Sequence, residues 1–201
     1  MKIDILHKAA DMFLEFGFKS VTMDDLATEM RVSKKTIYEH YNNKSDLVEA
    51  VTQHIKNQIN DEIHQVIAQN FDPIQEMIEI KNTVMKRLKN EKASPQYQLQ
   101  KYYPKIHEKL KNSHVCTMDQ CCTENVERGV KDGFYRDDLN IVFVVRAYIS
   151  GMLNIKNEDL FKSTDLSPKQ LYEEFLIYHL RSITTLKGKN RLDALLNIHT
   201  K

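Results

Sequence analysis

The chain has 201 residues, and its 29 Lys and Arg residues against 28 Asp and Glu residues leave a formal net charge of +1 at pH 7. This length suffices for one or two domains with a sizeable core. The near-neutral charge excludes a protein that coats nucleic acid or a membrane through its overall charge. If the protein binds nucleic acid or a membrane, it must do so through a local charged patch.

Neither a membrane span nor an export signal is readable in the sequence. It contains no apolar run of the roughly 18 residues that a membrane helix needs. The segment from Met1 to Lys19 is amphipathic and carries three acidic residues, unlike the apolar stretch of a signal peptide. We therefore expect a cytoplasmic protein with no membrane partner.

The spacing of glycine and proline predicts an all-α fold. Glycine is absent from Phe18 through Arg128, so this stretch lacks the turn-forming residues that usually separate strands and close hairpins. Helical spacing of apolar residues, caps and proline positions predict helices over about 2–16, 23–30, 33–40, 44–69 and 73–90, one or two short helices before Ser113, and helices over about 115–133, 138–154, 168–187 and 191–198.

The second and third of these helices are short and are joined by a tight turn. Thr22 can cap the second helix, and acidic residues follow it in the first turn. Ser33 can cap the third, after a turn around Arg31 and Val32. This arrangement predicts a helix-turn-helix.

The third helix belongs to the stretch VSKKTIYEHYNNKSDL, which starts at Val32. At about 100° per residue, Ile37 and Tyr41 can face the core while Thr36, Tyr38 and His40 point outward. Hydroxyl, phenol and imidazole groups flanked by lysines suit a DNA major groove, where side chains touch base edges and phosphates together. The alternative is that both tyrosines are core aromatics and the lysines are merely solvated.

The segment from Ile5 to Leu47 resembles the tetracycline-repressor-like (TetR) family of transcriptional regulators. The resemblance rests on Ala9, Phe13, Gly17-Phe18, Val21-Thr22, Asp25-Leu26-Ala27, Val32-Ser33, Thr36-Ile37-Tyr38, Tyr41 and Lys44-Ser45-Asp46-Leu47. A later pattern, Gly129, Gly133-Phe134-Tyr135 and Asp138-Leu139, is similar to the junction before the dimerisation helices of this family.

The resemblance implies a DNA-binding domain over residues 1–46 and a helical ligand-binding and dimerisation domain over 47–201. It implies that DNA is met by Thr22, Lys34, Thr36, Tyr38, His40 and Lys44, to which the helix pattern adds Lys35. Two residues depart from the family pattern. Arg31 stands where the family usually has glycine, and Asp24 stands where it often has arginine.

The larger domain is expected to bind an unknown small molecule and a second copy of the chain. Pocket candidates are Tyr102, Tyr103, His107, Met118, Cys122 and Tyr148. Dimer-interface candidates on the two last long helices are Val145, Tyr148, Met152, Phe175, His179 and Ile183. A two-fold dimer would hold two recognition helices about one DNA turn apart, roughly 34 Å, which predicts a palindromic operator.

No catalytic constellation is readable in the larger domain, so we expect neither an enzyme nor a cofactor. Cys116, Cys121 and Cys122 are odd in number and crowded, unlike a secreted disulfide framework, so reduced thiols are expected. On one helix His114 and Cys121 lie on the same side but about 10 Å apart along the axis, and Cys116 points elsewhere, so they cannot all bind one metal ion. A redox switch at the cysteines remains a hypothesis.

The leading interpretation is a homodimeric, ligand-responsive repressor that binds double-stranded DNA. A rival is a helical sensor that binds a small molecule or a protein without sequence-specific DNA binding, and the near-neutral charge fits it. A helical enzyme is a second rival. A salt titration separates the first two, because only a DNA binder loses affinity steeply as salt rises.

Overall fold

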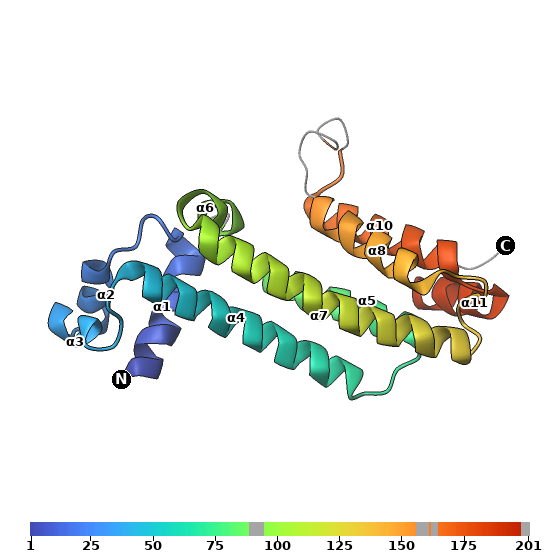
Figure 1. Ribbon diagram of the computed structural model, residues 1–201, viewed down its shortest axis with the longest axis horizontal. Helices are drawn as coiled ribbons and strands as arrows, with labels where there is room; N and C mark the ends of the chain where they lie inside the picture. The colour runs from blue at the N-terminus through green and yellow to red at the C-terminus, as the bar shows by residue number, and fades with distance from the viewer. Residues whose placement is uncertain (89–94, 156–160, 162–164, 198–201) are drawn as a thin grey trace. The chain divides into compact units, whose positions relative to one another are not determined.

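The computed structural model describes residues 1–88, 95–155, 161 and 165–197, and within these ranges every secondary-structure element is a helix (Figure 1). The predicted all-α class is confirmed. The chain divides into two compact units, which we call unit 1 (residues 1–64 and 83–113) and unit 2 (residues 65–82 and 114–201). Among the described residues, no helix is long and apolar enough to cross a membrane.

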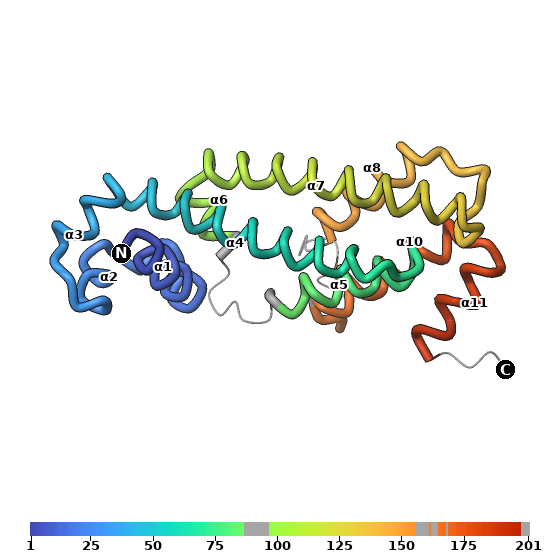
Figure 2. Tube along the Cα trace, turned by 90° about the horizontal axis from the view of Figure 1, so that it is seen from below, coloured from blue at the N-terminus to red at the C-terminus, as the bar shows by residue number. Residues whose placement is uncertain are grey.

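Unit 1 contains the predicted helix-turn-helix. Its first four helices are α1 (Lys2–Phe16), α2 (Met23–Met30), α3 (Lys34–Tyr38) and α4 (Lys44–Ile67). The predicted starts of α2 and α4 are confirmed, whereas α3 ends two residues before the predicted His40. Figures 1 and 2 show α1, α2 and α3 gathered around the first turns of α4.

One apolar core holds these helices together. Ile5, Leu26 and Ile37 are fully buried, so each helix contributes a side chain that leaves water on folding. Leu99 of α6 (Pro95–Tyr102) is buried in the same core, although it lies far along the chain. The helix-turn-helix is therefore packed against a later helix of unit 1.

The remaining helices are α5 (Pro73–Leu88), α7 (Pro104–Lys131), α8 (Ile141–Asn154), α10 (Pro168–Ile183) and α11 (Leu186–Leu195). The prediction of a break near Ser113 is wrong, because α7 is one helix of 28 residues. Pro104 starts it, where its missing N–H costs nothing, and no glycine or proline follows before Gly129. The predicted helix ends at Asn90 and Ile198 lie outside the described residues.

The predicted break between about 187 and 191 is also wrong, because α11 begins at Leu186 and includes Gly188. The helix instead starts after Thr185, whose hydroxyl accepts a hydrogen bond from the Gly188 N–H at 3.2 Å. A Cβ at Gly188 would lie 2.1 Å from the carbonyl oxygen of Phe134. Glycine is needed here for close approach and not for a turn.

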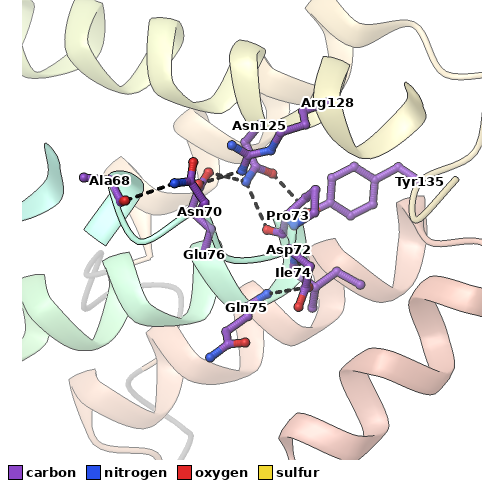
Figure 3. Close-up of polar contacts among 10 residues, drawn as sticks. All are labelled: Ala68, Asn70, Asp72, Pro73, Ile74, Gln75, Glu76, Asn125, Arg128 and Tyr135. Carbon is purple, nitrogen blue, oxygen red and sulfur yellow. Dashed lines mark hydrogen bonds and ion pairs between the residues drawn. The ribbon is translucent and has the colours of Figure 1, made fainter. Parts of the chain in front are cut away.

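In unit 2 the start of α5 is held by a buried polar network (Figure 3). The Asn125 amide donates to the Pro73 carbonyl at 3.0 Å and to Glu76 Oε1 at 2.7 Å. The Tyr135 hydroxyl donates to Asn125 Oδ1 at 3.1 Å, and Arg128 Nη2 lies 2.6 Å from Glu76 Oε2. Removing one partner would leave buried polar groups unpaired, so the network fixes α5 against α7.

Helices α8 and α10 pack closely in unit 2. The rings of Tyr148 and Phe175 stack with centroids 5.9 Å apart. A Cβ added at Gly151 would lie 2.0 Å from the Phe175 ring, so this position needs glycine for the two helices to approach. Both helices contribute apolar side chains to the core of unit 2.

Candidate nucleic-acid interface

The turn between α2 and α3 is closed by Arg31 in the left-handed conformation, with φ 55° and ψ 40°. The Val32 N–H donates to the Ala27 carbonyl at 3.0 Å, and the Arg31 N–H donates to the Thr28 carbonyl at 3.1 Å. These two bonds form a Schellman motif, which satisfies the last carbonyls of α2. The turn keeps the geometry that glycine usually supplies, at a cost to arginine of roughly 1 kcal/mol.

The start of α3 is capped as the sequence predicts. The Ser33 hydroxyl accepts a hydrogen bond from the Thr36 N–H at 3.1 Å, and its oxygen lies 2.8 Å from Thr36 Oγ1. Ile37 is fully buried and Tyr41 nearly so, which anchors the inner side of the helix. The Tyr41 hydroxyl donates to the Lys2 carbonyl at 3.4 Å.

The outer side of α3 presents the side chains predicted to meet DNA. Tyr38 is 41% exposed, Lys35 is exposed, and Thr36 and His40 are partly exposed. The geometry places a phenol, a hydroxyl and an ammonium group on one short helix and an imidazole in the turn that follows it. Such a set can donate to phosphates and read base edges in a groove.

Lys34 is engaged in an ion pair that the sequence did not reveal. Its Nζ lies 2.7 Å from Asp24 Oδ1 and 3.0 Å from Asp24 Oδ2, and 5.9 Å from the ring centroid of Tyr38. The hydrogen bond and charge of Asp24 raise the pKa of Lys34. Asp24 is therefore a residue of this surface, although sequence reasoning noted it only as a lost contact.

Thr22 caps α2 through a reciprocal pair with Asp25. Its hydroxyl accepts from the Asp25 N–H at 3.1 Å, while its own N–H and O–H each lie 2.8 Å from Asp25 Oδ2. These hydrogen bonds lower the pKa of Asp25. The hydroxyl of a residue predicted to meet DNA is thus already paired with a carboxylate.

Lys44, at the start of α4, donates from Nζ to the Lys19 carbonyl at 3.0 Å. Burial lowers the pKa of this ammonium, and Asp25 opposes that effect. The Lys19 N–H in turn donates to Gln98 Oε1 of α6 at 2.9 Å. Sequence reasoning missed Gln98, and nothing local could have found it, because it lies 79 residues away.

The predicted ligand residues are divided between the two units. Cys122 and Tyr148 line a cavity of about 10 Å³ in unit 2, which also has Asn125 and His179 in its wall. Met118 packs against the same core. The other three, Tyr102, Tyr103 and His107, lie in unit 1. The structure thus brings together two of the six predicted residues at one cavity.

Unit 1 has a larger and more open cavity of about 150 Å³ between α4 and α7. Thr52, Ile106 and Leu110 contribute to its wall, and none of the predicted ligand residues lines it. An ion pair between Lys109 Nζ and Glu49 Oε1, 2.5 Å apart, borders it.

The residues predicted to form a dimer interface are turned inward. Val145, Tyr148, His179 and Ile183 are buried in unit 2, while Met152 and Phe175 are partly buried against the same core. These side chains have little surface left for a partner. Helices α8 and α10 expose different apolar side chains, which were not among the predicted ones. Val142 is 72% exposed, Phe143 is 70% exposed and Tyr178 is 71% exposed.

The three cysteines differ in exposure. Cys116 is exposed, Cys121 partly exposed and Cys122 buried. Burial raises the pKa of the Cys122 thiol to about 12 and also raises that of Cys121, which lowers the reactivity of both. Among the described residues, no group of three His, Cys, Asp or Glu side chains could hold a metal ion.

Residues 5–51 match the model of the family described as bacterial regulatory proteins, tetR family. A curated relative, the HTH-type transcriptional regulator YdeS of Bacillus subtilis (strain 168), is 46% identical over 44 residues. That match spans 22% of this chain and 22% of the length of the relative.

Solved structures are similar over nearly the whole chain. A transcriptional regulator from Cytophaga hutchinsonii has a TM-score of 0.76 at 16% identity, covering 91% of this chain and 98% of that one. The regulatory protein TetR from Rhodobacter sphaeroides has a TM-score of 0.67 at 14% identity, covering 90% and 98%. The fatty acid degradation regulator FadR from Bacillus halodurans has a TM-score of 0.66 at 16% identity, covering 89% of this chain and 94% of that one.

The matched domain and the fold define a helix-turn-helix domain followed by a helical C-terminal part, as in solved transcriptional regulators. Residues 5–51 thus match the N-terminal domain of the tetR family of bacterial regulatory proteins, and the whole chain shares its fold with solved regulators. These relatives are described as transcriptional regulators.

Proposed function

We propose that the protein is a homodimeric repressor that binds a palindromic operator and releases it when a small molecule binds. The observation that carries the proposal is the division of α3 into two sides. Ile37 is fully buried, whereas the adjacent Tyr38 is 41% exposed, and Lys35 is exposed as well. A helix fixed from within and polar outside can lie in a major groove.

The DNA contacts we propose are the seven predicted ones: Thr22, Lys34, Lys35, Thr36, Tyr38, His40 and Lys44. We divide the chain into a DNA-binding domain over 1–46 and a ligand-binding and dimerisation domain over 47–201. The lysines would meet phosphates, and the outer side chains of α3 would meet base edges.

The dimer would form through α8 and α10. Their exposed apolar side chains, Val142, Phe143 and Tyr178, suit burial against the same side chains of a second copy. Large apolar side chains left in water favour burial against a partner. The side chains proposed for the interface are thus these three, with Met152 and Phe175 behind them.

The ligand would enter the cavity of unit 2. Cys122 and Tyr148, with Asn125 and His179, offer a mixed apolar and polar lining, which suits an apolar or amphipathic molecule. At about 10 Å³ the cavity has room for little more than one water molecule. A ligand must therefore move the lining, and it can shift DNA affinity only if it prefers one conformation.

In-vitro selection from a random DNA pool tests the proposal. We expect an enriched palindrome whose half-sites lie about one helical turn apart, roughly 34 Å. Enrichment of one half-site alone would contradict the dimer. Absence of any enriched sequence would support the rival, a helical sensor without sequence-specific DNA binding.

A further inference from the structure

The ion pair between Asp24 and Lys34 joins the first turn of α2 to the first turn of α3. Lys34 Nζ lies 2.7 Å and 3.0 Å from the two carboxylate oxygens of Asp24, so both oxygens face the ammonium group. Both side chains are more than half exposed. The pair therefore lies in water on the surface where DNA is proposed to bind, and it contributes little to stability.

The surroundings of the pair are already negative. Asp25, the next residue along α2, has its carboxylate within 2.8 Å of both the N–H and the O–H of Thr22. Two carboxylates thus stand at the positive end of α2, where a phosphate would otherwise be favoured. Lys35 differs from Lys34, because it forms no ion pair with any residue that the structure describes.

We propose that Asp24 limits the affinity of the protein for DNA of any sequence by holding Lys34. The proposal rests on the proposed DNA-binding function. In the free protein Lys34 is already neutralised, so its approach to a phosphate requires separation of the pair and brings the Asp24 carboxylate towards the phosphate backbone.

The size of the effect follows from counterion release. Each phosphate that a protein neutralises adds about 0.9 to the slope of log affinity against log salt. At about 0.1 M salt this corresponds to roughly tenfold in affinity for each contact. Loss of the Lys34 contact therefore weakens binding to any duplex by about this factor for each protomer.

The effect is the same for every sequence. Phosphates occur on every duplex, so a lost phosphate contact weakens binding to the operator and to other DNA alike, and it leaves the contacts from Thr36, Tyr38 and His40 unchanged. Asp24 is thus a positioning residue for Lys34.

A labelled duplex of random sequence tests this without knowledge of the operator. Affinity is measured by fluorescence anisotropy between about 50 and 200 mM KCl, the range over which phosphate contacts change affinity steeply. Asp24→Asn keeps the size of the side chain and removes its charge. We expect it to bind roughly tenfold more tightly for each protomer at about 0.1 M salt, with a slope steeper by about 0.9.

Glu29→Gln is the matched control. Glu29 forms an ion pair of the same length, 2.7 Å, with Lys8 in the same domain. It lies five residues after Asp24 on α2, which is about 7.5 Å along the axis and about 140° around it. It changes the net charge equally, so its expected effect is within about twofold, as for distant screened charges.

Lys34→Gln completes the design. It should lower affinity less in the wild type than in the Asp24→Asn background, where it should abolish the gain. Equal effects of Asp24→Asn and Glu29→Gln, or an equal loss from Lys34→Gln in both backgrounds, would overturn the role of Asp24 while leaving DNA binding intact. If none of the proteins binds the duplex at the lowest salt, both this role and the proposed DNA binding fail.

Discussion

Lys44 Nζ donates a hydrogen bond to the carbonyl oxygen of Lys19 at 3.0 Å, which ties the start of α4 to the loop before α2. An ammonium group has three donors, so this bond leaves others for a phosphate. Lys44 can therefore hold the loop and contact DNA at the same time.

Substitution Lys44→Met should lower both stability and DNA affinity. Loss of the bond to Lys19 should cost about 1 kcal/mol of unfolding free energy. Loss of the phosphate contact should reduce the salt slope by about 0.9 for each protomer. Urea unfolding and a salt titration measure the two effects separately, and an unchanged slope would mean that Lys44 only positions the loop.

Substitution Tyr38→Ala should weaken operator binding and leave the dimer and the fold intact, because the side chain is largely outside the core. Loss of a base contact costs about 1–3 kcal/mol, or roughly 5- to 150-fold in affinity. Tyr97→Ala is a matched control, since Tyr97 is an exposed tyrosine of α6. Equal operator affinity of the Tyr38 variant and the control would contradict the proposed contact.

Sequence reasoning located the helix-turn-helix well because its determinants are local. Thr22 and Ser33 cap the helices that follow them, and each cap acts within three residues. The burial of Ile37 next to the exposed Tyr38 follows from helical periodicity alone. The left-handed conformation of Arg31 was not predictable in this way, because the sequence showed only that arginine stands where the family usually has glycine.

Contacts between distant residues were not predictable in this way. The bond between Lys19 and Gln98 and the pair between Lys34 and Asp24 depend on how helices pack, which no local pattern encodes. For the same reason, periodicity found Val145 as an apolar position of α8 but could not tell a side chain of the chain's own core from one facing a partner.

The stability of the protein should fall between neutral and mildly acidic pH because of His179. Burial lowers the pKa of His179 from 6.5 to about 4, so the folded state keeps the imidazole neutral. The stabilisation is fully present above pH 6.5 and is lost as pH falls towards 4, because the unfolded state binds the proton first. Between pH 7 and 5 the loss is about 2 kcal/mol.

Urea unfolding at these two pH values, compared with a His179→Gln variant, measures this contribution. Glutamine does not titrate, so the variant should lose about 2 kcal/mol less than the wild type over the same interval. An equal pH dependence of the two proteins would assign the effect to other groups.

The proposed dimer should depend on the exposed apolar side chains of α8 and not on those that were first predicted. Phe143→Glu places a charge in the proposed interface and should shift the protein to a monomer in sedimentation velocity, because burying an unpaired carboxylate is costly. Leu186→Glu is the matched control, since Leu186 of α11 is 75% exposed against 70% for Phe143. Because both substitutions add the same charge to an exposed position, only the location differs. A Phe143 variant that stays as dimeric as the Leu186 variant would exclude this face of α8 from the interface.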